Sequence, residues 1–313
     1  MEQKTVGVLF YGSPEPDHRT RLLNPLRGNY RVVPYYAGGD KNELGELAGL
    51  LSGVDIIVAS DTEAALAALN GTDRHIVVVI AGDPIKSGLN ETPLQPGGRV
   101  TGHAFDKGVI PLKDRTWETD SGEQRLCLLD ALGIKDSDGE PFTRVRVIYN
   151  QDENAAKVAF DKIDDAGNKR PRKINVRSAS FRGANPDFEQ ACQQTADAHA
   201  IIQVNEPVGD RQDQILDCTR AQPTLYEAEW YVRRPDGGLA AYVPDVDNGF
   251  SGLLSCAVTL VDQILGHPAA PLPPMTVIPR KMIVNTATAA MLGIDPPANG
   301  ATICGGVRVE YYP

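Results

Sequence analysis

Acidic, amide and hydroxyl side chains follow directly after several apolar runs of this sequence. With the run that precedes each, they are Asp61 and Thr62 after DIIVAS, Asp83 after HIVVVI, Asn150 and Asn154 after RVRVIY, and Glu206 after HAIIQV. A carboxylate or carbonyl oxygen can accept hydrogen bonds from an ammonium group, and the N–H groups at a helix N-terminus attract a carboxylate. The set therefore predicts a site for a small polar molecule.

Four aromatic residues lie in or beside the same predicted loops, and they could pack against the apolar part of such a molecule. They are Tyr11, Tyr149, Tyr226 and Trp230. A purely structural alternative exists for every candidate, because Asp, Thr and Asn commonly cap helices or begin turns. An aromatic ring in such a loop can equally belong to the core.

Alternating strands and helices are needed to position these side chains, and the hydrophobic pattern predicts them. Apolar strands such as TVGVLF, DIIVAS and HIVVVI alternate with helices such as ELGELAGLLS and TEAALAALN. A second series starts with SGEQ, which resembles a capping box, and continues through RLCLLDALG, RVRVIYN and NAAKVAFDKIDDAG. Continuous apolar strands between helices indicate parallel sheets covered on both faces, so the predicted fold class is α/β. Ligands of such sheets lie beyond the carboxyl ends of the strands.

A long connection separates the two series. Residues 81–102, AGDPIKSGLNETPLQPGGRVTG, carry turn chemistry at Asp83-Pro84, Gly88 and Pro96-Gly97-Gly98. Connections of this length without secondary structure are uncommon and are usually functional or disordered. We interpret this segment as the wall of a ligand crevice followed by a crossing between two lobes.

The composition excludes several classes of protein. The 313 residues are 42% hydrophobic and 23% charged, and this length is typical of about two globular domains. The formal net charge of −10 argues against nucleic acid as a partner. We find no run of about 18 apolar residues and so expect no membrane insertion. The N-terminus, MEQKTVGVLF, has no signal-peptide pattern, so the chain is either cytoplasmic or a mature form whose signal peptide was removed.

The five cysteines form no CxxC pair, and their number is odd. We therefore expect neither a metal site nor a disulfide framework. Four of them, Cys127, Cys192, Cys218 and Cys256, fall in helical patterns, where a cysteine usually acts as a small buried hydrophobe.

Several motifs carry a resemblance to a known family. VASDTEAALAA, IVVVIAGDPIKSGL and PGGRVTG resemble, in this order, a run in the ABC-transporter substrate-binding proteins whose better-known members bind tryptophan or tyrosine. VRVIYNQDENAAKVAF resembles the family's strand, Asn and Glu-Asn motif, and VDQILGHPAAPLPP with RKMIVNTATAAMLGIDPP resembles its C-terminal part. The ordered set spans most of the chain and is more specific for the family than for its ligand.

This resemblance implies a type I periplasmic-binding-protein fold, in which two Rossmann-like lobes with parallel sheets are joined by a three-segment hinge and close over a solute. The first lobe would comprise residues 1–102 and 244–280, and the second residues 103–243 and 281–313, with crossings near 100–103, 241–244 and 279–283. It also implies a small-molecule ligand held in the interlobe cleft, a membrane permease as partner, a periplasmic location, a monomer, and no cofactor or metal.

The resemblance also bears on the site. Asp61-Thr62 matches a small polar pair of the family, Asn150 and Asn154 match its second-lobe motif, and Glu206 matches an acidic position. If the solute is an amino acid, we expect Glu206 to bind its ammonium group. The chain departs from the family where Asp61 replaces a smaller residue and where Pro207 replaces a small polar one.

The predicted loops are rich in acids, which would repel a ligand carboxylate unless they are paired or face outward. The seven acids are Asp61, Glu63, Asp83, Glu153, Glu206, Glu227 and Glu229. An aromatic amino acid is thus the family default, and a cationic or a bulky, mostly apolar solute stays open.

Two other classes of function compete with a solute receptor. An enzyme, such as a racemase, is disfavoured because no cysteine lies in a predicted crevice loop and no GxGxxG, P-loop or nucleophile-elbow motif is found. A ligand-sensing module similar to a repressor's effector domain would require a signalling partner, since this chain starts in a strand and not in a DNA-binding helical unit.

Overall fold

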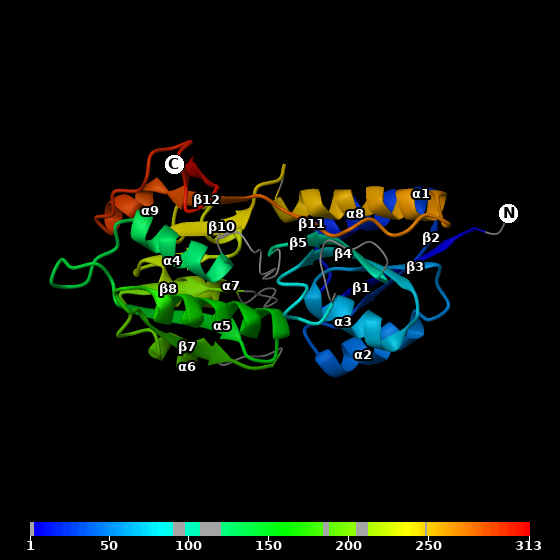
Figure 1. Cartoon of the computed structure of the whole chain (residues 1–313), viewed down its shortest axis with the longest axis horizontal. Helices are drawn as coiled ribbons and strands as arrows, with labels where there is room; N and C mark the ends of the chain where they lie inside the picture. The colour runs from blue at the N-terminus through cyan, green and yellow to red at the C-terminus, as the bar shows by residue number, and fades with distance from the viewer. Residues whose placement is uncertain (1–2, 90–97, 107–119, 184–187, 205–211, 248) are drawn as a thin grey trace. The chain divides into compact units, whose positions relative to one another are not determined.

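The computed structural model describes all residues except 1–2, 90–97, 107–119, 184–187, 205–211 and 248 (Figure 1). The chain divides into two units. Unit 1 comprises Met1–Ile110 and Val246–Ile278, and unit 2 comprises Pro111–Asp245 and Pro279–Pro313. Each unit is a sheet with helices on both faces, which confirms the predicted α/β class.

The described sheet of unit 1 is parallel throughout, with the strand order β11-β5-β4-β3-β1-β2. The strands in the middle of this order, β4, β3 and β1, are rich in Val and Ile and are almost entirely buried, as expected for a parallel sheet covered on both faces. Their bounds are β1 (Thr5–Phe10), β2 (Arg31–Tyr36), β3 (Ile56–Ala59), β4 (His75–Ala81), β5 (Val100–Ala104) and β11 (Thr276–Val277).

Helices cover this sheet on two faces and form two separate core clusters. Helices α2 (Lys41–Leu50) and α3 (Thr62–Gly71) pack on one face. On the other face lie the π-helix η1 (His18–Leu23), α1 (Asn24–Asn29) and α8 (Gly249–Gly266). The sequence pattern did not predict η1 and α1. Pro25 and Gly28 interrupt the apolar spacing of α1, and η1 has apolar residues only at Leu22 and Leu23.

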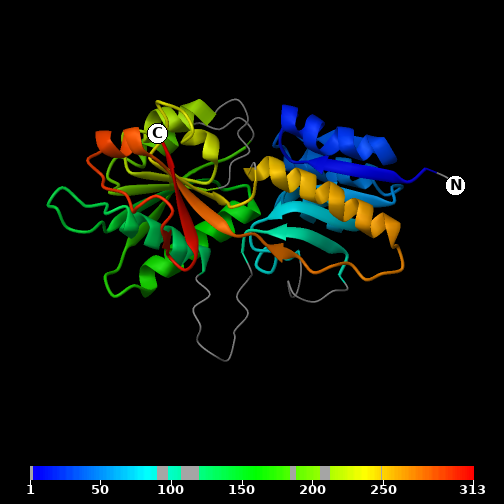
Figure 2. The same ribbon diagram turned by 90° about the horizontal axis from the view of Figure 1, so that it is seen from above.

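Helix α8 has 18 residues and a mean hydropathy of 1.4, so by length and composition alone it could cross a membrane. No such helix was expected from the sequence. Leu253, Leu254, Ala257 and Val261 of α8 pack into the core of unit 1 against strands of its sheet (Figure 2). Helix α8 thus packs on the sheet through one face, and 33% of its 18-residue window is buried in total.

The sheet of unit 2 is mixed, in the order β13-β14-β12-β10-β9-β8-β6-β7. β12 runs antiparallel to β10, and β13 runs antiparallel to β14, while the other pairs are parallel. The bounds are β6 (Arg144–Asn150), β7 (Asn175–Phe181), β8 (Ala200–Gln203), β9 (Thr224–Tyr226), β10 (Ala240–Pro244), β12 (Arg280–Asn285), β13 (Thr302–Ile303) and β14 (Val307–Tyr312).

The helices of unit 2 are α4 (Ser121–Ala131), α5 (Asn154–Lys169), α6 (Phe188–Gln193), α7 (Gln212–Thr219), the short 3-10 helix η3 (Glu229–Tyr231) and α9 (Thr286–Met291). The N-cap of α4 is Asp120, whose side chain accepts from the N–H of Gly122 at 3.0 Å, so Ser121 is the first helical residue. The predicted capping box beginning at Ser121 is therefore wrong by one position, because the carboxylate of Asp120 competes with the Ser121 hydroxyl for the same donors.

Four of the five cysteines form disulfides, which corrects the expectation of buried free thiols. Cys127 pairs with Cys304 across 177 residues, and Cys192 pairs with Cys218 across 26, each with a Cα–Cα distance of 5.7 Å. Cys256 is free and exposed. Pairing depends on tertiary proximity and on geometry that spacing alone does not reveal. Two disulfides indicate an oxidising compartment.

Candidate functional site

Both sheets contain a topological switch point at which the strand order reverses. In unit 1 it lies between β1 and β3, and in unit 2 between β6 and β8. At such a point two neighbouring strands send their following segments to opposite faces, which leaves a crevice beyond their carboxyl ends. Most of the predicted site residues lie at the ends of these strands or follow them.

The carboxyl edge of unit 1 joins three loops through hydrogen bonds. The Tyr11 N–H, after β1, donates to Ser60 Oγ at 3.3 Å, and Ser60 Oγ in turn donates to the carboxylate of Asp61. The Gly82 N–H, after β4, donates to Thr62 Oγ1 at 3.0 Å. The structure thus brings Tyr11, Asp61 and Thr62 together, and Ser60, which the sequence analysis did not select, links two of the loops.

Asp61 has a structural role at this edge. Its side chain caps α3 by accepting from the N–H of Ala64 at 2.9 Å, and burial raises the pKa of its carboxyl group. Asp61 therefore has the helix-capping role that was the structural alternative to ligand binding. A capping residue at a strand end can also contact a ligand.

Asp83 begins the long connection after β4 and is buried. Its Oδ1 accepts from the N–H groups of Ile85 and Lys86 at 3.0 and 2.9 Å, and its carbonyl oxygen accepts from the hydroxyl of Ser87 at 2.7 Å. These bonds build the first turn of the segment 81–102 and give the Asp83-Pro84 pair the predicted Asx-type turn. Residues 90–97 of this connection lie outside the described part of the chain.

An aromatic stack at the ends of β1 and β2 was not predicted. The ring of His18 lies 4.2 Å from that of Phe10, which lies 4.4 Å from that of Tyr36. His18 Nδ1 accepts from the Glu15 N–H at 3.3 Å, and burial lowers the pKa of His18 to about 4. The imidazole is therefore neutral near pH 7. The sequence feature that could have indicated a buried histidine here is the position of His18, about one helical turn before the apolar pair Leu22-Leu23.

In unit 2, Tyr149 and Asn150 end β6 and are buried. Tyr149 stacks on Phe160 at 5.0 Å, and burial raises the pKa of its hydroxyl. Asn150 Oδ1 accepts from the Asp152 N–H at 3.0 Å, while its Nδ2 donates to Glu153 at 3.3 Å. Asn154 is the half-buried first residue of α5. The structure therefore groups these three predicted residues around one strand end.

The two remaining aromatic candidates differ from each other. Tyr226 is fully buried, its ring lies 4.5 Å from that of Tyr231, and its hydroxyl is 2.7 Å from Thr219 Oγ1. This environment is that of a core residue. Trp230 is half-buried against Tyr231, with ring centroids 3.5 Å apart. Glu206, the predicted ammonium partner, lies outside the described residues.

The acids of the predicted loops are largely paired with cations or with local donors. Glu63 pairs with Lys41 at 2.8 Å, Glu229 with Arg233 at 2.9 Å, and Glu227 with Arg125 at 2.9 Å. Asp61 and Asp83 accept from backbone N–H groups as described above, and Glu153 accepts from Asn150. The repulsion of a ligand carboxylate that seven unpaired acids would cause is thereby reduced.

A charged network at the carboxyl edge of unit 2 was not predicted from the sequence. Arg125, buried in the first turns of α4, donates to Glu227 directly after β9, and the Glu227 N–H donates to Gln203 at the end of β8. On its other side the guanidinium lies 5.4 Å from the ring centroid of Tyr242, on β10. The sequence signal was an arginine inside the otherwise apolar run RLCLLDALG.

Gln124 extends this network to β12. Its Oε1 accepts from Arg280 Nη1 at 2.7 Å and from the hydroxyl of Tyr242. The guanidinium of Arg280 lies 5.3 Å from the Tyr242 ring, so a second cation–π contact forms on the same tyrosine. The network joins α4, β9, β10 and β12 at one edge of the sheet.

A metal centre is not evident in the part of the chain that the structure describes. No group of three or more His, Cys, Asp or Glu residues among these positions could hold a metal ion.

Comparison with known proteins shows similarity at the level of structure. No family model matches the sequence, and no curated protein sequence matches it. A solved structure described as an ABC domain in complex with L-Trp, from Streptococcus pneumonia, is 20% identical and has a TM-score of 0.73. The match covers 93% of this chain and 96% of that one.

Two further structures are similar over most of their length. A conserved domain protein from Vibrio cholerae is 20% identical, with a TM-score of 0.74 and coverage of 95% of this chain and 96% of that one. The ligand-free, open structure of a substrate binding protein with adhesive properties from Clostridium difficile is 20% identical, with a TM-score of 0.58 and coverage of 98% of both chains. These matches confirm the predicted type I periplasmic-binding-protein fold.

Proposed function

We propose that this chain is the solute-binding component of an ABC importer and that its solute is an aromatic amino acid. The observation that carries the proposal is the position of the candidate side chains. Tyr11, Asp61 and Thr62 gather at the switch point of one sheet, and Tyr149, Asn150 and Asn154 gather at that of the other. In folds of this class, the crevice at a switch point is where ligands bind.

An amino acid fits the chemistry of these edges. Backbone N–H groups at the starts of α3 and α5 can receive a carboxylate, and the half-buried ring of Trp230 offers an apolar face. Because most loop acids are engaged by cations or local donors, a carboxylate on the solute does not face a large unpaired negative charge. Glu206 remains our proposed partner for the ammonium group. The structure similar to this chain that contains L-Trp supports the same choice.

The proposed partners follow from this function. A membrane permease would accept the solute, and the two disulfides are consistent with a periplasmic location. We expect the receptor to be a monomer that needs no cofactor and catalyses no turnover. Solute would favour the bound conformation only through its higher affinity for that conformation.

The first test is to denature the purified protein and identify the released small molecule by mass spectrometry, followed by thermal-shift measurements with L-tryptophan, L-tyrosine and L-phenylalanine. A solute at 100 times its dissociation constant should stabilise the protein by about 2.7 kcal/mol. A cationic or lipid-like released molecule, together with no response to the amino acids, would contradict the proposed solute and leave the fold unchanged.

The second test concerns Glu206. We expect Glu206→Gln to weaken L-tryptophan binding roughly 10- to 100-fold, because the ammonium group loses a charged acceptor. Glu140→Gln is the matched control, since Glu140 is exposed and its nearest cation, Arg172, lies 3.9 Å away. Equal affinity of the two variants in isothermal titration calorimetry would remove Glu206 from the site.

A further inference from the structure

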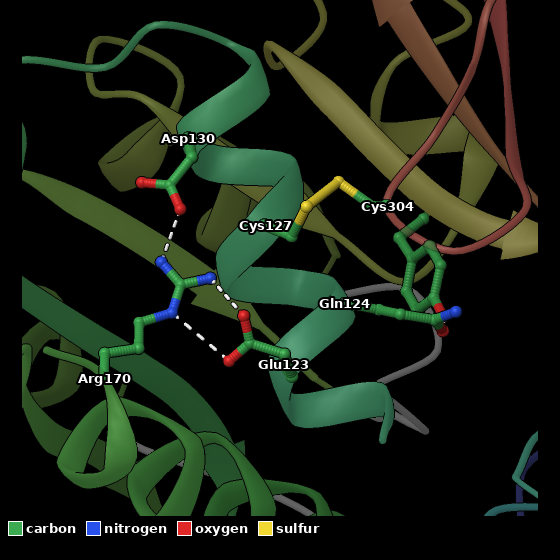
Figure 3. Close-up of a disulfide and its surroundings, with 7 residues drawn as sticks. Glu123, Gln124, Cys127, Asp130, Arg170 and Cys304 are labelled. Atoms are coloured by element: carbon green, nitrogen blue, oxygen red, sulfur yellow. Dashed lines mark hydrogen bonds and ion pairs between the residues drawn. A yellow bond between two sulfur atoms is a disulfide. The ribbon is translucent and has the colours of Figure 1, made fainter. Parts of the chain in front are cut away.

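Helix α4 carries Gln124 and Arg125 to the carboxyl edge of the unit 2 sheet, and other elements fix its position along its length. Arg170 directly follows α5. Its guanidinium donates to Glu123 of α4 at 2.7 Å and also pairs with Asp130 (Figure 3). Gly122 lies so close to the backbone of Lys162 that a Cβ atom would stand 2.3 Å from its carbonyl oxygen. These contacts fix α4 against α5.

The Cys127–Cys304 disulfide fixes α4 from a different direction. Cys127 lies three residues after Gln124, which is one helical turn, so both side chains leave the helix on neighbouring positions of its surface (Figure 3). Cys304 lies in the turn between β13 and β14, and its φ of 49° is in the left-handed region that residues other than glycine rarely adopt. The disulfide therefore connects α4 to the hairpin at the end of the sheet order.

The hairpin in turn belongs to the same network. β14 pairs with β12, and Arg280, the first residue of β12, donates to Gln124. A closed path of contacts thus leads from α4 to the C-terminal strands and back. The disulfide links Cys127 to Cys304 beside β14, β14 pairs with β12, and Arg280 of β12 returns to Gln124 through a charge-assisted hydrogen bond. A closed path of this kind restricts both rotation and translation of the first turns of α4.

We propose that the Cys127–Cys304 disulfide is a positioning element, which keeps Gln124 and Arg125 at the carboxyl edge of unit 2 in the geometry that solute binding requires. The statement that solute binding requires this geometry rests on the proposed function. The statement that the disulfide positions Gln124 and Arg125 does not. Arg125 holds Glu227 directly after β9, at the carboxyl edge where we propose that solute binds. Small displacements of groups that shape a binding site cost affinity, so loss of the disulfide should weaken solute binding beyond any general loss of stability.

The second disulfide provides a matched control within the same unit. Cys192 and Cys218 lie within two residues of the C-terminal ends of α6 and α7. Helices that follow parallel strands begin at the carboxyl edge of the sheet and run back towards the opposite edge. Cys192–Cys218 therefore joins helix ends at the opposite edge of the sheet. Its connection to the Arg125 network runs through the 2.7 Å contact of Thr219 with Tyr226, which precedes Glu227.

The first experiment needs no solute. Hydrogen exchange of the full-length protein would be followed in peptides covering residues 121–131 for the wild type, Cys127→Ser/Cys304→Ser and Cys192→Ser/Cys218→Ser. We expect exchange in this segment, measured relative to peptides of β6 in the same variant, to be at least tenfold faster for the first variant and unchanged for the second. Equal exchange of this segment in both variants would overturn the proposal.

The second experiment measures L-tryptophan affinity by calorimetry. We expect about tenfold weaker binding for Cys127→Ser/Cys304→Ser and unchanged binding for the control. In an Arg125→Lys background, removal of the disulfide should have little further effect, because the two changes disturb the same geometry. Additive effects would indicate general destabilisation and would contradict a positioning role.

Two safeguards keep the outcomes distinct. If Cys127→Ser/Cys304→Ser does not fold, the remaining disulfide of folded Cys192→Ser/Cys218→Ser protein can be reduced with tris(carboxyethyl)phosphine and the same measurements made before and after. If the wild type does not bind L-tryptophan, the proposed solute is wrong, and the exchange of residues 121–131 still decides whether the disulfide positions α4.

Discussion

The carboxyl edges of the two units are built from different kinds of contact. In unit 1, two backbone N–H groups, two hydroxyl groups and the carboxylate of Asp61 link the loops after β1, β3 and β4, across separations of 49 and 20 residues. In unit 2, Arg125, Gln124 and the Cys127–Cys304 disulfide make contacts across 102, 156 and 177 residues.

This difference has a physical consequence. The edge of unit 1 depends on short polar side chains near strand ends, which form as soon as neighbouring strands pair. The edge of unit 2 depends on long charged side chains and a covalent cross-link. The Gln124–Arg280 bond and the Cys127–Cys304 disulfide form only when the C-terminal strands β12 and β14 have joined the sheet. We therefore expect unit 2 to respond more strongly to single long-range changes, because loop closure over long separations costs more entropy.

The largest expected effect separates the two disulfides. In the chain-entropy model, losing the 177-residue cross-link should lower the free energy of unfolding by about 5 kcal/mol, against about 3.5 kcal/mol for the 26-residue one. Urea denaturation of the two Cys→Ser double variants, followed by hydrogen exchange of peptides from each unit, would measure the difference. Larger destabilisation by Cys192→Ser/Cys218→Ser would reverse this order.

Asn285 tests a second long-range contact of unit 2. This fully buried side chain donates to the carbonyl oxygens of Val232 and Arg234 at 3.1 and 2.9 Å, and it accepts from the Thr288 N–H at 3.0 Å. We expect Asn285→Ala to cost about 3 kcal/mol in urea denaturation, since it leaves buried polar groups unpaired. Asn285→Asp keeps the acceptor that caps α9, but it points a buried carboxylate at two carbonyl oxygens and should cost at least as much as Asn285→Ala.

His18 makes unit 1 sensitive to acid. Burial lowers its pKa to about 4, whereas in the unfolded chain it titrates near 6.5. Between these values only the unfolded state binds the proton, so the free energy of unfolding should fall by up to about 3 kcal/mol as the pH drops from 6.5 to 4. Urea denaturation at several pH values would measure this, and His18→Phe should flatten that part of the profile. An unchanged slope in the variant would assign the effect to other groups.

The smallest expected effect concerns Thr62. Thr62→Val removes the acceptor of the Gly82 N–H and should cost about 1 kcal/mol, while Thr62→Ser should be close to neutral because it keeps the hydroxyl. Denaturant titration compares the two variants. A cost for Thr62→Val as large as that for Asn285→Ala would remove the contrast between the units.

The sequence predicted the architecture well, because strand and helix patterns are local. Runs such as HIVVVI and DIIVAS are continuous and apolar, and they lie in a parallel sheet as expected. Residues after these strands, such as Thr62 and Asn150, were selected because the carboxyl ends of parallel strands meet at one edge. The π-helix at His18 was missed because only Leu22 and Leu23 of its six residues are apolar, which gives no helical periodicity.

What the sequence determined by itself was the class of fold and the polar loops at strand ends. Only the tertiary structure decided which cysteines pair, that Tyr226 lies in the core, and that Arg125 reaches Glu227 across 102 residues. The physical reason is range. Hydrophobic periodicity acts within one element, whereas a disulfide or a buried ion pair depends on where distant elements meet, and no local pattern encodes that meeting.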